Sequence, residues 1–414
     1  MCVIDGTVLV GERLNPPPEV AAPMEKPILP SEVDVAVVGA GVIGLAIAWR
    51  LASRGLSVAV FDRGAPGSGT TFAATGMLAA AAEHEPGGEN LLALAIESQR
   101  LWPGFRSAIE AESHLSIDYR DEGTLVVALG RDEVERLRFR YDHQRRAGLG
   151  IQWLNGTEAR RREPGLRSSV AAGVLCAEDH QVDPRHLIPA LVRALRARGG
   201  RIFQNCIVES LETSGGRLSG LVTSAGACKA QTAIIAAGAW SAEGPLSSIV
   251  EIPVRPLKGQ ALALRTTPQS GSLSHVVWTE QVHLAPKSNG TLIVGATMEE
   301  AGFNPAITAG GALMLLEGVH RALPSSEEME IEAIWSGFRP TTEDDAPILG
   351  VTPVPGLLVA TGHHRNGILL VPATATAIEQ LVISGTMTGA AQPFGLDRFQ
   401  KQSSNSSSIV GVEP

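Results

Sequence analysis

Three glycines and an aspartate form a pattern that can bind phosphate and ribose groups. Residues 39–44 read Gly-Ala-Gly-Val-Ile-Gly, and Asp62 follows eighteen residues after Gly44. In such a pattern Gly39 permits a tight turn, Gly41 lets the backbone approach a pyrophosphate, and Gly44 lets a helix pack on a strand. The helix N-terminus favours an anion, and Asp62 can accept hydrogen bonds from a ribose. An isolated G-x-G-x-x-G also occurs in ordinary turns, so the neighbouring elements decide.

The elements that a dinucleotide site needs surround this motif. Asp34–Val38 is a short, valine-rich run typical of a buried parallel strand. Apolar residues recur at helical spacing over Ile43–Arg54, and Gly55 ends that helix. Leu56–Phe61 is a second apolar strand that leads into Asp62. The complete strand–helix–strand unit predicts a Rossmann-like fold with a bound dinucleotide.

Two arginines are placed where an anionic substrate could bind. Arg339 lies in Gly-Phe-Arg-Pro, residues 337–340, and Arg365 lies in Gly-His-His-Arg-Asn-Gly, residues 362–367. A single arginine is usually a surface charge with a buried stem. Two arginines on glycine-flanked loops at predicted strand ends favour an anion site, because a guanidinium offers a planar pair of donors.

Later segments of the sequence predict a second, inserted sheet. Asp183-Pro184 has the residues of a helix start, and Ile202–Val208 is predicted to rejoin the parallel sheet. Between residues 251 and 295, short strands alternate with polar breaks, and Asn289-Gly290 is a strong hairpin signal. We therefore expect an inserted antiparallel sheet, after which Glu332–Gly337 returns to the first domain.

Composition and charge limit the class of partner. Of the 414 residues, 44% are hydrophobic and 19% charged, and the net charge of −9 argues against a nucleic-acid partner. The four cysteines lack metal or redox spacing, so no metal site is expected and a reducing cytoplasm fits. The sequence contains no apolar run that predicts a membrane span. Residues 1–30, with six prolines, and residues 400–414, rich in serine, are predicted to be disordered.

Taken together, the motifs resemble the D-amino-acid oxidase family of flavoproteins, and within it the glycine oxidases of thiamine biosynthesis. The resemblance covers about Val33 to Phe399. It rests on the segments GAGVIG, GSGTTFAATGML, VDPR, AAGAWS, IPVRPLKGQ, LIVGATM, GFRPTTEDDAPILG, GHHRNGILLVPAT and the final Asp397-Arg398-Phe399. It implies non-covalently bound FAD and an α/β fold in which a Rossmann-like FAD-binding domain carries an inserted antiparallel-sheet substrate domain. The expected boundaries are 31–83, 160–250 and 332–399 for the first domain, and 84–159 and 251–331 for the second.

The resemblance also implies which residues hold the cofactor. The ADP half would contact Gly39, Gly41, Gly44, Val42, Ile43, Asp62 and Arg63, with the Val208 backbone at the adenine. The pyrophosphate and flavin would contact Thr70, Thr71, Thr75, Gly76 and Met77, with Gly238 nearby. The flavin ring would be wrapped by His363, His364, Arg365, Asn366, Gly367, Ile368 and Leu369.

For the substrate, the resemblance implies that Arg339 pairs with a carboxylate and that Arg365 is a second contact. Met77, Met298 and Trp278 would line the same pocket. His283 stands where the family often has a tyrosine. It is either a hydrogen-bond donor that replaces the phenol or a histidine satisfied within the sheet.

The implied reaction is the oxidation of glycine, with sarcosine and small D-amino acids as further substrates. Its products would be an imine, or glyoxylate and ammonia, together with hydrogen peroxide from molecular oxygen. A thiazole synthase is an expected partner for the imine, and the protein is expected to be a cytoplasmic homo-oligomer. Two alternatives remain open: a dehydrogenase of the same fold with another electron acceptor, and a flavin-binding protein without turnover.

Overall fold

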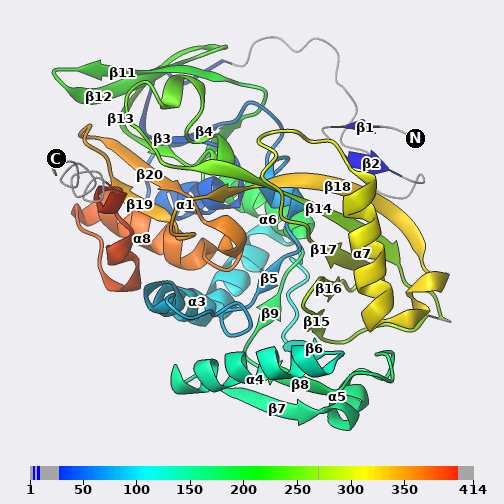
Figure 1. Ribbon diagram of the computed structural model, residues 1–414. Helices are drawn as coiled ribbons and strands as arrows, with labels where there is room; N and C mark the ends of the chain where they lie inside the picture. Colours follow the sequence, from blue (N-terminus) through cyan, green and yellow to red (C-terminus); the bar gives the residue numbers. More distant parts are fainter. Residues whose placement is uncertain (1–2, 5–6, 10–27, 269, 400–414) are drawn as a thin grey trace, which may run out of the picture.

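In the described part of the chain the strands form three sheets. The computed structural model describes residues 3–4, 7–9, 28–268 and 270–399, and two large sheets lie beside one another with helices packed around them (Figure 1). An eight-stranded sheet contains the strands predicted around the glycine motif. A ten-stranded sheet contains the segment predicted to be antiparallel. A two-stranded sheet joins β5 (Met77–Leu78) to β9 (His180–Gln181).

The eight-stranded sheet has a parallel centre. β3 (Glu32–Val38) pairs in parallel with β4 (Val58–Phe61) on one side and with β13 (Gly226–Ile235) on the other. The remaining strands are β10 (Arg201–Phe203), β11 (Val208–Ser214), β12 (Arg217–Thr223), β19 (Ile348–Val351) and β20 (Leu357–Thr361). With α1 at Val42–Ser53, the structure confirms the predicted strand–helix–strand unit.

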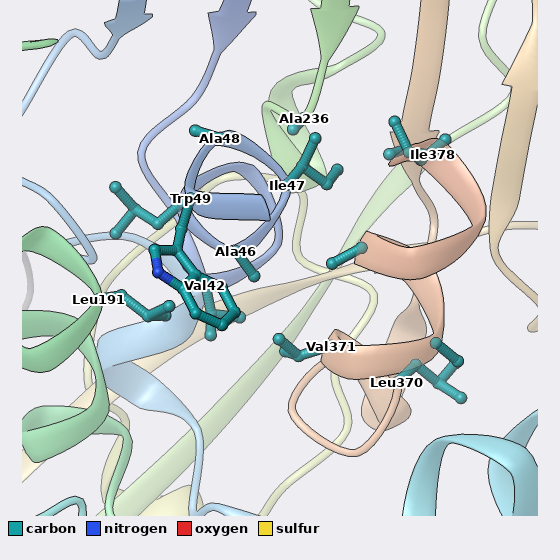
Figure 2. Close-up of a cluster of buried hydrophobic side chains, with 14 of the residues drawn as sticks. Val42, Ala46, Ile47, Ala48, Trp49, Leu191, Ala236, Leu370, Val371 and Ile378 are labelled. Atoms are coloured by element: carbon teal, nitrogen blue, oxygen red, sulfur yellow. The ribbon is translucent and has the colours of Figure 1, made fainter. Parts of the chain in front are cut away.

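Side chains of β3 alternate between two hydrophobic layers. Val35 and Val37 face the helices, whereas Ala36 and Val38 face the opposite layer, as the two-residue period of a strand requires. The helical layer consists of α1, α3 (Glu89–Ser113), α6 (Pro184–Ala197) and α8 (Val371–Ser384). Figure 2 shows Trp49 of α1 close to Leu191 of α6, with Val371 and Ile378 of α8 also lining this core.

The start of α6 follows the predicted chemistry. The Asp183 side chain accepts a hydrogen bond from the backbone N–H of Arg185 at 2.9 Å, and Pro184 occupies the first turn. The cap satisfies an N–H that the helix cannot pair itself, and proline loses no hydrogen bond there. The structure thus confirms Asp183-Pro184 as a helix start.

The ten-stranded sheet is built around one long antiparallel pair. β14 (Arg255–Arg265) and β18 (Glu330–Thr341) pair from Arg255 opposite Thr341 to Arg265 opposite Glu330. The strand order is β1-β2-β18-β14-β17-β16-β15-β6-β8-β7. These other strands are β1 (Val3–Ile4), β2 (Thr7–Leu9), β6 (Thr124–Ala128), β7 (Ile151–Asn155), β8 (Ala172–Cys176), β15 (Val276–Trp278), β16 (His283–Pro286) and β17 (Thr291–Gly295).

Helices α4 (Arg131–Arg146), α5 (Gly156–Arg162) and α7 (Ala309–Ala322) pack on this sheet, and the short α2 (Thr70–Ala73) contacts β18. β16 and β17 form the hairpin predicted at Asn289-Gly290, and Gly290 has the positive φ of 85° that such a turn requires. None of the described helices is both long enough and apolar enough to traverse a bilayer.

Three predicted boundaries are wrong. Glu332–Gly337 does not return to the first sheet, because its backbone is paired with β14. Ala172–Cys176, placed by the sequence in the FAD-binding domain, is β8 of the ten-stranded sheet, paired with β6 and β7. Helix α3, expected in the substrate domain, buries Leu94, Trp102 and Ile109 in the core formed with α1, α6 and α8.

Two predicted segments also differ from expectation. The strand predicted over Ile202–Val208 ends at Phe203, because Asn205 adopts a left-handed conformation with φ 54°, and Val208 begins a separate antiparallel strand. Residues 1–30 are not wholly disordered. Thr7–Leu9 lies on the edge of β18, with Leu9 opposite Ala333, and supplies backbone partners that an edge strand otherwise lacks. Residues 10–27 and the predicted disordered tail, 400–414, lie outside the described residues.

The core between α1 and α8 allows a matched stability test. Ile378 is fully buried, whereas Ile383 on the same helix is 56% exposed. We expect Ile378→Ala to lower the free energy of unfolding by about 2–5 kcal/mol, because it removes apolar contacts and leaves a cavity. Ile383→Ala should change it by less than about 0.5 kcal/mol. Chemical denaturation followed by circular dichroism measures both, and equal losses would contradict the assigned core.

Candidate active site

A large cavity is lined by residues of both main sheets. Its volume is about 1050 Å³, and its wall includes the glycine loop after β3, both strands of the long β14–β18 pair and the loop after β20. A pocket for a drug-sized ligand typically measures about 300–1,000 Å³, so this one can hold a dinucleotide together with a small substrate. Ligands of open α/β sheets bind at such carboxyl ends of parallel strands.

The three glycines of the motif differ in what surrounds them. A Cβ atom on Gly39 would lie 2.4 Å from the Ala236 carbonyl oxygen, and one on Gly44 would lie 2.0 Å from the Gly39 carbonyl oxygen. Both positions therefore exclude any larger residue. A Cβ atom on Gly41 would have only the Thr71 hydroxyl oxygen within 4 Å, at 3.5 Å. The space next to Gly41 is therefore open toward the cavity. Gly39 and Gly41 line the cavity, while Gly44 lies behind its wall and serves helix packing.

Asp62 lies at the end of β4, on the cavity wall. Its Oδ2 accepts a hydrogen bond from the Ala40 N–H at 2.6 Å, and its Oδ1 accepts one from the Gly64 N–H at 2.8 Å. Burial raises the pKa of Asp62, and these two N–H donors oppose that shift. The carboxylate thus fixes the glycine loop from a position on the cavity wall. Beside it, the Arg63 guanidinium lies 4.2 Å from the centre of the Trp240 ring.

The predicted pyrophosphate and flavin segment also lies on the wall. Thr70, Thr71, Thr75, Gly76 and Met77 all line the cavity, as do Val42, Ile43, Val208 and Gly238. The Thr71 hydroxyl accepts a hydrogen bond from the Val42 N–H at 3.1 Å and so connects this segment to the start of α1.

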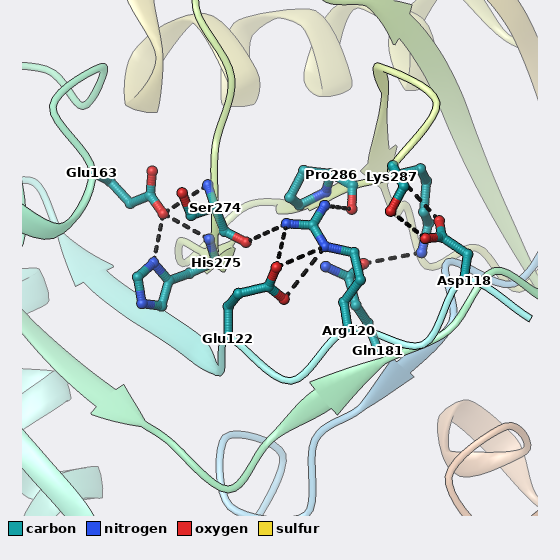
Figure 3. A network of polar contacts seen from close by, with 10 residues as sticks. Asp118, Arg120, Glu122, Glu163, Gln181, Ser274, His275, Pro286 and Lys287 are labelled. Atoms are coloured by element: carbon teal, nitrogen blue, oxygen red, sulfur yellow. Dashed lines mark hydrogen bonds and ion pairs between the residues drawn. The ribbon is translucent and has the colours of Figure 1, made fainter. Parts of the chain in front are cut away.

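Lys287 is a buried cation that no local sequence pattern marks as part of the site. Its Nζ donates to the carbonyl oxygens of Thr75 at 2.8 Å and Val182 at 2.9 Å, and to Gln181 Oε1 at 3.0 Å. Burial lowers the pKa of Lys287 to about 8. Figure 3 shows it beside Arg120, which donates to the Pro286 carbonyl oxygen. These contacts hold the Thr75 backbone at the cavity, and their partners lie more than a hundred residues from Lys287 in the sequence, where no local pattern marks them.

Some residues of the loop after β20 line the cavity, and others lie behind its wall. His363, His364, Arg365, Gly367 and Ile368 line the cavity. Asn366 and Leu369, both predicted to touch the flavin, lie behind the wall. The reason is that this loop turns into α8: the Leu369 carbonyl oxygen faces α3, where it accepts hydrogen bonds from the Ser98 hydroxyl and Trp102 Nε1.

Arg339 lies in β18 with its guanidinium in the cavity wall. Its Nη1 donates to the Thr297 carbonyl oxygen at 3.1 Å, and no carboxylate among the described residues lies within ion-pair distance. A Cβ atom on Gly259 of β14 would lie 2.5 Å from that nitrogen, so the facing strand must carry glycine there. Burial lowers the pKa of Arg339, although a guanidinium stays charged in proteins. A desolvated cation with spare donors is suited to an anion.

His283 lies beside Arg339 and is neutral. Burial lowers the pKa of His283 to about 3, with further lowering from the charges of Arg339 and Lys287. Its Nε2 is buried and has no hydrogen-bond partner among the described residues. This favours a ligand contact over a histidine satisfied within the sheet. Trp278, on the paired strand, and Met298, which is 68% exposed, complete this part of the wall.

Arg365, expected to be a second substrate contact, is paired with two carboxylates. It lies at the more exposed edge of the cavity, where its Nε is 2.8 Å from Glu83 Oε2 and its Nη2 is 3.5 Å from Glu85 Oε1. The Arg365 charge is therefore already balanced. Glu83 also lines the cavity. The sequence placed it only at a domain boundary, because no local pattern joins residue 83 to residue 365.

An aromatic group on the wall was not selected from the sequence either. The Trp240 and Phe303 rings stack with centres 5.2 Å apart, and Phe338 packs edge-on against Phe303 at 5.3 Å. All three line the cavity. Trp240 and Phe338 fall within segments that carried the family resemblance, whereas Phe303 lies in a loop without any motif.

Comparisons with known proteins agree with this geometry. The family model described as FAD dependent oxidoreductase (DAO) matches residues 34–381. The chain is 35% identical to glycine oxidase of Geobacillus kaustophilus over 368 residues, which cover 88% of this chain and 97% of that protein. The crystal structure of glycine oxidase from Geobacillus kaustophilus matches with a TM-score of 0.84 and 34% identity, covering 89% of this chain and 99% of the other.

A second relative is longer than this chain. The bifunctional protein ThiO/ThiG of Trichormus variabilis is 35% identical over 374 residues, which cover 90% of this chain but 56% of that protein. The chain thus spans about half the length of this relative. Because the family model matches most of the chain, and the glycine loop, cavity and sheets have the arrangement that a dinucleotide requires, the chain belongs to the DAO family of FAD dependent oxidoreductases.

Proposed function

We propose that the protein oxidises glycine, with sarcosine and small D-amino acids as further substrates. The observation that carries this proposal is the Arg339 guanidinium, which lies in the cavity wall without a carboxylate partner among the described residues. The glycine oxidases among its relatives support the choice of substrate. Glycine plus oxygen and water would give glyoxylate, ammonia and hydrogen peroxide.

In this proposal Arg339 fixes the substrate carboxylate with two charge-assisted hydrogen bonds. His283, neutral and with a free Nε2, contributes a further polar contact beside it. Together they orient the α-carbon toward the part of the cavity lined by Thr75, Gly76 and Met77. When bound, FAD supplies the two-electron acceptor. The amine reacts in its neutral form, so we assign no side chain as a general base.

The cellular setting is part of the same proposal. The likeness to a bifunctional ThiO/ThiG protein supports transfer of the imine product to a thiazole synthase for thiamine. Cys176, Cys206 and Cys228 are buried free thiols, which suits a reducing cytoplasm. The expected homo-oligomer stays a prediction.

Arg339→Lys tests the carboxylate contact. Lysine offers one compact charge in place of a planar pair of donors, so one charge-assisted bond of about 1.5–3 kcal/mol should be lost. We expect kcat/KM for glycine to fall about tenfold to hundredfold, with FAD content unchanged. Arg255→Lys is the control, because Arg255 on β14 is paired with Glu300 and 53% exposed. Parent-like turnover of Arg339→Lys would show that Arg339 is only structural.

The pH dependence tests the protonation state of the substrate. Burial lowers the pKa of His283, His363 and His364 to about 3, so these imidazoles stay neutral above about pH 5. The protonation of the substrate amine then determines how kcat/KM changes with pH. For glycine, kcat/KM should rise with pH, by up to about tenfold per unit, until that amine is titrated. Steady-state kinetics from mildly acidic to alkaline pH measures this rise. An inflection near 6.5, the ordinary pKa of histidine, would contradict it.

A further inference from the structure

Glu83 is a buried acid on the substrate side of the cavity that the proposed reaction does not use. Only 8% of its side chain is exposed, and it lines the cavity together with Arg339 and Arg365. Its Oε2 lies 2.8 Å from Arg365 Nε, and its carbonyl oxygen accepts a hydrogen bond from Arg365 Nη2 at 3.3 Å. Burial raises the pKa of Glu83, while the charges of Arg365 and Arg339 oppose that shift.

The backbone just before Glu83 is held by several polar contacts. The N–H groups of Ala81 and Ala82 donate to the two carboxylate oxygens of buried Asp179, each at 2.9 Å. Arg140 Nη2 donates to the Ala82 carbonyl oxygen at 2.7 Å, and Gln144 Nε2 donates to that of Ala81 at 2.9 Å. Each donor or acceptor comes from a distant part of the chain, so the backbone that leads into Glu83 is fixed by its surroundings.

The charges divide the cavity into two parts. Inside, Arg339 has no carboxylate within ion-pair distance among the described residues. At the edge, Arg365 is balanced by Glu83 and by the more exposed Glu85, and Glu280, another wall residue, pairs with Arg136. One substrate carboxylate therefore finds a cation with spare donors. A second carboxylate on the same substrate would meet an arginine already engaged and a carboxylate of like charge.

We propose that Glu83 is a specificity-determining residue that restricts the substrate to amines bearing one carboxylate. It does so by occupying Arg365 and by repelling a second substrate carboxylate. This inference rests on the proposed function for its substrate class. Glu83→Gln keeps the size of the side chain, removes its charge and releases Arg365 to bind an anion.

The test compares monocarboxylate and dicarboxylate substrates in the FAD-loaded protein. For Glu83→Gln we expect the ratio of kcat/KM for iminodiacetate to that for glycine to rise about tenfold or more. Glu85→Gln is the matched control, because Glu85 contacts the same arginine at 3.5 Å and its side chain is 59% exposed. Its ratio should change less than about twofold. A parallel loss for both substrates in Glu83→Gln would show a structural role and overturn the proposal.

A binding measurement separates this inference from the proposed reaction. Acetate and malonate lack an amine, so their dissociation constants can be obtained from changes in the visible flavin spectrum without turnover. Glu83→Gln should strengthen malonate binding relative to acetate, again by about tenfold, even if glycine proves not to be the substrate. An unchanged ratio with normal FAD content would overturn the role of Glu83 regardless of which amine is oxidised.

Discussion

The site depends on keeping the Arg339 guanidinium desolvated without a carboxylate at ion-pair distance among the described residues. Burying a charge is costly unless hydrogen bonds or nearby charges compensate. Here the Thr297 carbonyl oxygen accepts one hydrogen bond, and the more distant charge of Glu83 opposes the effect of burial on the Arg339 pKa. The compensation is incomplete, and this leaves donors available for a substrate carboxylate. A carboxylate placed directly on Arg339 would stabilise the protein but block the site.

The two sheets explain how this cation comes to line the same cavity as the glycine loop. The long β14–β18 pair carries Arg339 and requires Gly259 opposite it, while β3 and α1 carry the glycine loop. Lys287 connects the two parts, because it extends from the β16–β17 turn to the Thr75 carbonyl oxygen. The glycine loop and Arg339, the proposed carboxylate contact, therefore lie on the wall of one cavity.

Local patterns in the sequence predicted the parts of the fold that local chemistry determines. The unit from β3 to Asp62, the Asp183 cap and the Asn289-Gly290 hairpin depend on residues close in the chain, and each was found. Contacts between residues distant in the sequence could not be predicted from local patterns. β18 lies in the ten-stranded sheet because β14 pairs with it, and α3 packs on the first domain although its sequence shows only an amphipathic helix. The roles of Glu83 and Lys287 likewise depend on partners more than a hundred residues away.

The central claim is that the protein uses FAD to oxidise an amino acid held by Arg339. The most direct test is the visible spectrum of the purified FAD-loaded protein under anaerobic conditions as glycine is added. We predict that glycine bleaches the oxidised flavin bands, and that admitting air restores them with release of hydrogen peroxide. Bleaching that air does not reverse would indicate a dehydrogenase with another acceptor. An oxidised spectrum that glycine, sarcosine and small D-amino acids all leave unchanged would contradict the account.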